Sequence, residues 1–157
     1  TGELEEKPNL YCGHRATLAK VILENYGIES RYVNLISSKF ESLSGHVFLE
    51  VKNKDKWEVY DPDYSIFYVD NLGERISLKE LIFEDDFLPC DTNMNCSWGV
   101  NNSQALLDQD LFSLGWVHNE NLFYLEKSGF NYQGIYTFMG VTGNFYEYSG
   151  GNYIERE

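Results

Sequence analysis

A thiol, an imidazole and a carboxylate occur in this sequence at positions that suit nucleophilic chemistry. Cys12 lies where an extended stretch passes into a helical pattern, His46 opens an alternating strand pattern, and Asp61 ends the next strand pattern. In such a set the imidazole takes the proton from the thiol, and the carboxylate fixes the tautomer of the imidazole. The elements that carry these three residues therefore decide whether the chemistry is possible.

Cys12 begins a predicted helix that runs to about Tyr26. Apolar residues recur there at helical spacing, and Gly27 supplies a stop. One stripe of this helix contains Cys12, Ala16, Ala19 and Leu23, so we expect the thiol to face a sheet. The free N–H groups of a helix N-terminus favour a thiolate, although a small cysteine that merely packs is an equally good interpretation from position alone.

His46 and Asp61 belong to a predicted hairpin over residues 44–64. A two-residue turn pairs Lys52 with Asp55 and sets His46 opposite Asp61, whereas a four-residue loop pairs Lys52 with Trp57 and sets His46 opposite Asp63. An odd-length loop or a bulge would break the pattern. Both registers place the same side chains on one face: His46, Phe48, Trp57, Val59, Asp61 and Asp63.

The remaining histidines and Arg15 are weaker candidates. His14 follows Cys12 by two residues, about 200° around a helix, so its ring is predicted to face away from the sulfur. Arg15 is expected to have a solvated surface role, with added positive potential near the thiol as the alternative. His118 follows a predicted helix end at Gly115 and is expected in a loop.

Cys90 and Cys96 flank a predicted loop, where a small disulfide and two idle thiols are both plausible. Together with His118 they give only a weak indication of a metal site. We therefore expect neither a metal nor an organic cofactor.

Composition predicts one α+β domain over residues 1–157, with its motifs in 9–64 and an aromatic part in 90–157. The 157 residues are 43% hydrophobic, enough for one core, and a helix is predicted over 103–114. Glycine-broken aromatic strands follow in "ENLFYLE", "GIYTFMG" and "NFYEYSGG". We expect these rings mainly in a core, with sugar or peptide binding as the alternative.

The charge and the hydropathy exclude several partners. A net charge of -13 disfavours nucleic acid and anionic membrane surfaces. No apolar run reaches the roughly 20 residues that span a bilayer, and the first residues have no signal-peptide pattern. We expect a soluble protein, with cytoplasm slightly favoured but the compartment left open. The acidic stretch "FEDDF" is interpreted as a solvated face, with a bias toward basic or neutral substrates as the alternative.

The stretches "YCGHRATLAKVILENYGIESRYVNL", "GHVFLEV" and "KWEVYDPDY" resemble the core of the transglutaminase-like superfamily. The resemblance covers residues 9–64 and implies a papain-like core, with a helix that bears the cysteine packed on an antiparallel sheet. It implies Cys12 as nucleophile, His46 as base and Asp61, not Asp63, as the orienting carboxylate.

Because the superfamily includes transglutaminases, peptide N-glycanases and bacterial cysteine peptidases, the resemblance implies attack on an amide through a thioester. The substrate would be a peptide, a protein or a glycopeptide, and hydrolysis is our first expectation over acyl transfer. Few residues precede Cys12, so Asn9 and Tyr11, with the Cys12 N–H, are the candidates for oxyanion stabilisation. The alternative function is a non-catalytic peptide- or glycan-binding domain on the same fold.

Overall fold

The chain folds into a large sheet with short helices around it. The computed structural model describes residues 10–37, 45–108, 111–118, 120, 122–125, 144–149 and 152–156. In chain order the elements are α1 (Cys12–Asn25), β1 (Ser30–Ile36), β2 (Gly45–Asn53), β3 (Lys56–Asp61), β4 (Ile66–Asp70), α2 (Leu78–Phe83), β5 (Phe87–Asp91), η1 (Val100–Asn102), α3 (Gln104–Asp108), η2 (Leu111–Ser113), β6 (Leu114–Val117), β7 (Leu122–Leu125), β8 (Asn144–Ser149) and β9 (Asn152–Arg156). The predicted α+β class is confirmed.

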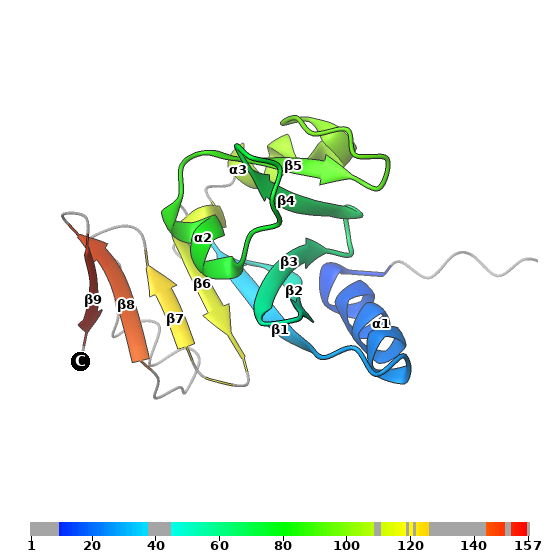
Figure 1. Cartoon of the computed structure of the whole chain (residues 1–157), viewed down its shortest axis with the longest axis horizontal. Coiled ribbons are helices and arrows are strands. Elements are labelled where there is room, and N and C mark those ends of the chain that lie inside the picture. Colours follow the sequence, from blue (N-terminus) through cyan, green and yellow to red (C-terminus); the bar gives the residue numbers. More distant parts are fainter. Residues whose placement is uncertain are drawn as a thin grey trace, which may run out of the picture.

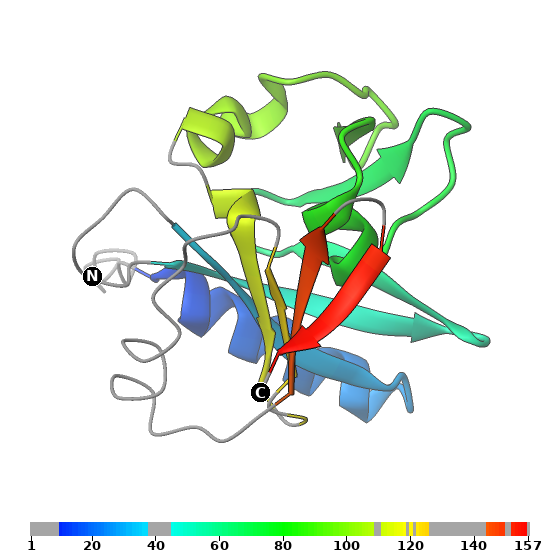
Figure 2. The same ribbon diagram turned by 90° about the vertical axis from the view of Figure 1, so that its left-hand side faces the viewer.

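The strands in the described part of the chain form a nine-stranded sheet in the order β5-β4-β3-β2-β1-β6-β7-β8-β9. From β5 to β7 every neighbouring pair is antiparallel. β8 then runs parallel to β7 and antiparallel to β9, which forms the edge in Figures 1 and 2. The central strands β1, β2 and β3 hold the residues of interest.

The two faces of the sheet carry different layers. α1 packs against β1 and β2, where Val47 lies beside Gly13 of the helix, and it stands apart from α2 and α3 in Figure 1. On β2 the next residue, Phe48, points the other way into the main core. That core unites buried residues of β1 to β4, α2, α3, η2 and β6, among them Val33, Val59, Tyr68, Leu81 and Leu106.

Helix α1 agrees with the predicted stripe. Ala16 is fully buried and Cys12, Ala19 and Leu23 are half-buried, while Leu18 and the other residues on the far side are exposed. The helix ends at Asn25, and Gly27 follows with a φ of 71°, a conformation that glycine adopts without a steric penalty. The small residues therefore allow close approach of the helix to the sheet.

The β2–β3 hairpin takes the second predicted register. Lys52 pairs with Trp57, and the ladder continues to Asn53 and Lys56, so that only Lys54 and Asp55 form the turn. The register that pairs Lys52 with Asp55 is wrong, because the turn lies one residue further along the chain. The register places Phe48, Trp57, Val59 and Asp61 on one face, and His46 contacts Asp61 there, as predicted. Asp63 lies beyond the end of β3 and pairs with Arg15 instead.

The region after residue 90 differs from the predicted pattern. The predicted helix over 103–114 is divided into α3 and η2, and Gly115 lies within β6 instead of ending a helix. A Cβ at Gly115 would come within 3.0 Å of Leu78 and 3.1 Å of Ile82, so the glycine permits contact between α2 and the sheet. Strands are confirmed in "ENLFYLE" and "NFYEYSGG", whereas "GIYTFMG" lies outside the described residues.

Cys90 and Cys96 form a disulfide. Cys90 is fully buried near the end of β5 and packs with Phe67, Val69 and Tyr60, so the two cysteines flank a turn as predicted. The bond closes a short loop after β5. None of the helices in the described part of the chain is long and apolar enough to cross a membrane.

We expect the Cys90→Ala/Cys96→Ala variant to lose about 2 kcal/mol of unfolding free energy, because a short disulfide loop restricts the unfolded chain by roughly that amount. Urea denaturation of the oxidised wild type and of the variant measures the difference. Reduced wild type is the control and should resemble the variant. Equal midpoints for all three forms would contradict a stabilising role for the bond.

Candidate active site

His46 and Asp61 meet in a direct contact between β2 and β3. His46 Nε2 lies 2.9 Å from Asp61 Oδ2, and both side chains are almost completely buried. The last pair of the β2–β3 ladder is Leu49 with Tyr60, so the same register, if continued, sets Phe48 opposite Asp61. Asp61 therefore lies diagonal to His46 and not directly opposite it. The predicted imidazole and carboxylate are thus brought together, although by a different pairing than the direct one.

The second oxygen of Asp61 is occupied by the backbone of the following turn. Asp61 Oδ1 accepts hydrogen bonds from the N–H of Asp63 at 2.8 Å and from the N–H of Tyr64 at 3.1 Å. The residue is 1% exposed. A buried carboxylate needs such partners, because removal of an ionised group from water is costly unless hydrogen bonds replace its hydration. The turn therefore fixes the carboxylate toward His46.

Two aromatic rings hold the imidazole of His46. The ring of Phe48 meets the imidazole edge to face, with 4.9 Å between the ring centroids. The ring of Tyr64 lies at a centroid distance of 5.4 Å, with 45° between the ring planes. His46 is 8% exposed. Because Nε2 faces Asp61, the ring nitrogen left for a reacting group is Nδ1.

Cys12 is the first residue of α1 and is a free, half-buried thiol. Among the described residues no hydrogen bond joins its sulfur to His46. The ring of Tyr64 lies against His46, with 5.4 Å between the ring centroids. Burial, then Asp61, Asp63 and Cys12, raise the pKa of Tyr64, so its hydroxyl stays protonated.

Arg15 ties the first turn of α1 to the turn after β3. Its Nη1 lies 2.7 Å from Asp63 Oδ1 and donates to the backbone oxygen of Asp63 at 3.0 Å. The residue is partly exposed, so the expected surface location holds, but the guanidinium is paired and not simply solvated. Asp63 is consequently committed to Arg15, which leaves Asp61 as the partner of His46.

His14 and His118 lie in other environments. His14 is exposed and uses Nδ1 to accept a hydrogen bond from the Tyr11 N–H, in agreement with the prediction that it does not face the sulfur. His118 directly follows the end of β6. Its ring stacks on that of Trp116, with 4.2 Å between the ring centroids, and its Nε2 contacts Asn34 Oδ1 of β1. Burial lowers the pKa of His118. In the described ranges no cluster of His, Cys, Asp or Glu could hold a metal ion.

The oxyanion candidates have contrasting positions. Tyr11 is 70% exposed beside the start of α1, and Asn9 lies outside the described residues.

The sequence analysis missed Tyr64, although this residue contacts both His46 and Asp61. The only available signal was its place in "YDPDY", where a tyrosine follows a strand end and a turn.

The arrangement can orient an imidazole and accept a proton at its free nitrogen, next to a helix that begins with a thiol. Comparisons with known proteins add no family to this description. No protein-family model matches the chain, and neither the curated proteins nor the solved structures include a match.

Proposed function

We propose that the protein is a cysteine-dependent amide hydrolase or acyltransferase that acts through a thioester on Cys12. The contact that supports it is the 2.9 Å approach of His46 Nε2 to the buried Asp61 Oδ2. The ordered resemblance of residues 9–64 to the transglutaminase-like superfamily supports the same roles. In this proposal Cys12 is the nucleophile, His46 the base and Asp61 the orienting carboxylate.

In this proposal the proton follows a route that is compatible with the His46–Asp61 contact. Nε2–H donates to Asp61, so neutral His46 presents the lone pair of Nδ1 and accepts the proton of the Cys12 thiol there. The thiolate attacks the amide carbon, and His46 returns the proton to the departing amine as the C–N bond breaks. A thioester on Cys12 remains.

The second half of the cycle regenerates the thiol. Water, or an amine in the case of transfer, loses a proton to His46 Nδ1 and attacks the thioester carbon. The C–S bond breaks and the proton passes to sulfur. Hydrolysis is our first choice between these outcomes, and neither needs a metal or an organic cofactor.

Helix α1 contributes to this chemistry through its position. The first N–H groups of a helix have no partner within it, and they stabilise a negative charge at its start. The Arg15–Asp63 ion pair anchors that start beside the turn that holds Asp61. The helix and the hairpin are therefore joined at the point where the sulfur and the imidazole must cooperate.

We expect iodoacetamide to modify Cys12 near neutral pH, and His46→Ala to slow the reaction about tenfold, because the base that raises the thiolate fraction is lost. Asp61→Asn should slow it less. Intact-mass spectrometry measures the rate. The matched control is His14→Ala, which removes an exposed imidazole from the same helix and should leave the rate unchanged. If His46→Ala reacts as fast as wild type, Cys12 is not activated and the binding-domain alternative gains support.

Two variants of Tyr64 distinguish the contribution of its ring from that of its hydroxyl. We expect Tyr64→Ala to slow alkylation of Cys12 roughly tenfold and to alter its pH profile, because the imidazole loses the ring that packs against it and small displacements of a base cost large factors. Tyr64→Phe keeps the ring and should stay within about twofold of wild type. A profile for Tyr64→Ala that coincides with wild type would remove Tyr64 from the site.

Product analysis tests the proposed reaction directly. Wild type and Cys12→Ala are incubated with peptide, glycopeptide and amine-donor panels, and products are identified by mass spectrometry. We expect cleaved products with wild type and none with Cys12→Ala, because the thioester requires the sulfur. A mass gain on an amine acceptor would assign transfer instead. Equal products from both proteins would contradict the proposal.

A further inference from the structure

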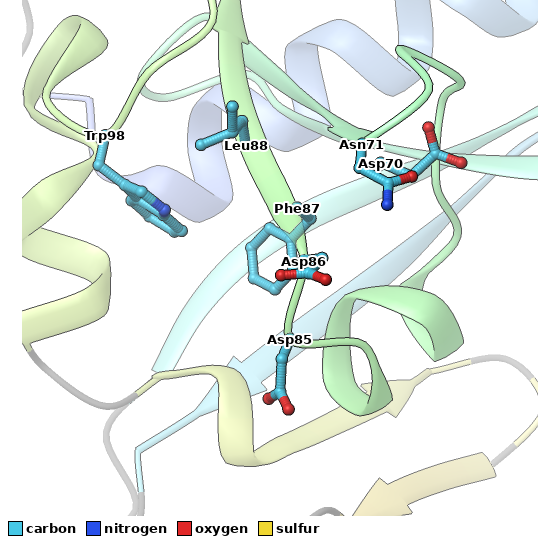
Figure 3. A pocket seen from close by; sticks show the side chains of 7 residues that line it. All are labelled: Asp70, Asn71, Asp85, Asp86, Phe87, Leu88 and Trp98. Carbon is cyan, nitrogen blue, oxygen red and sulfur yellow. The ribbon is translucent and has the colours of Figure 1, made fainter.

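A second concave site lies at the start of β5, where the chain leaves α2. It encloses about 460 Å³. Its walls come from the end of β4, the segment before and within β5, and the loop after β5: Asp70, Asn71, Asp85, Asp86, Phe87, Leu88 and Trp98. Figure 3 shows apolar and acidic side chains from these elements around one space.

The apolar part of this pocket is firmly supported. Phe87 meets Trp98 at 5.6 Å and Phe112 at 5.4 Å, and Trp98 also contacts Phe112. These rings pack on the main core, so the wall they form is held in place. Leu88 is 40% exposed at the same site. The pocket therefore offers fixed apolar surface to a ligand.

Three carboxylates and the amide of Asn71 form the rest of the lining. Asp70 is anchored, because its Oδ1 accepts hydrogen bonds from the N–H groups of Leu72 and Glu74. Asp85 and Asp86 are exposed, and no described lysine or arginine forms an ion pair with either. None of the described residues that line the pocket is basic. The negative charge beside the aromatic wall is thus left for a ligand to balance.

We propose that this pocket binds a lysine or arginine side chain of a basic peptide. The cationic head would contact Asp85 and Asp86, and the aliphatic stem would lie on Phe87 and Trp98, where cation–π attraction adds to apolar contact. A net charge of -13 favours the approach of such a peptide. This binding does not depend on the proposed amide chemistry.

The pocket and the candidate active site lie toward the two ends of β4. Ile66 pairs with Asp61 at one end, and Asp70 lines the pocket at the other. Three residues lie between Ile66 and Asp70, and the four steps along the strand span about 13 Å. The pocket and the His46–Asp61 contact are therefore distinct places on the sheet.

Fluorescence anisotropy with labelled hexapeptides tests the proposal. The probes are three Arg-Leu repeats, three Gln-Leu repeats and three Glu-Leu repeats. Wild type should bind the Arg-Leu peptide at least about tenfold more tightly than the other two, because only its charge complements the carboxylates. The double variant Asp85→Asn/Asp86→Asn should weaken that binding about tenfold. It should keep the fold, because both replacements are isosteric and exposed.

The matched control is Asp55→Asn/Glu155→Gln, which removes the same charge from exposed residues outside the pocket. It should change the affinity less than about twofold. An equal loss in both double variants, equal affinity for the neutral peptide, or no binding of the Arg-Leu peptide would overturn the proposal. Alkylation of Cys12 in Asp85→Asn/Asp86→Asn should match wild type, so failure here is distinct from failure of the amide chemistry.

Discussion

The buried carboxylate of Asp61 is the constraint around which the centre of the fold is arranged. A charge of this kind must be surrounded by donors, and here the two backbone N–H groups of the next turn and the imidazole of His46 supply them. A one-residue slip of β3 would move Asp61 to the other face of the sheet and leave these donors without it. The polar contact therefore fixes the register as firmly as the apolar core does.

The candidate site occupies a place where several elements end. His46 is the second residue of β2, Asp61 the last of β3, and Cys12 the first of α1. The helix packs on the Val47 side of the sheet, whereas His46 contacts Phe48 on the side of the main core. Tyr64 is also outside the strands, in the turn after β3, and its ring lies against the imidazole of His46.

Local pattern in the sequence accounts for much of this architecture. Helical period and Gly27 predicted α1 with its buried stripe, and strand alternation predicted that His46 and Asp61 share a face. The turn of the hairpin was not determined, since Lys54 adopts a positive φ that its residue type does not signal. Gly115 was misread because its role depends on α2, a contact between segments far apart in the chain. The roles of Tyr64 and Arg15 were hidden for the same reason.

The disulfide between Cys90 and Cys96 has a practical consequence. The chain contains three cysteines, and this bond uses two of them, so the folded oxidised protein carries a single free thiol, Cys12. A maleimide dye, a spin label or a thiol resin therefore attaches at one position, Cys12 at the start of α1. A labelling stoichiometry above one thiol per chain would therefore report that the Cys90–Cys96 bond is open.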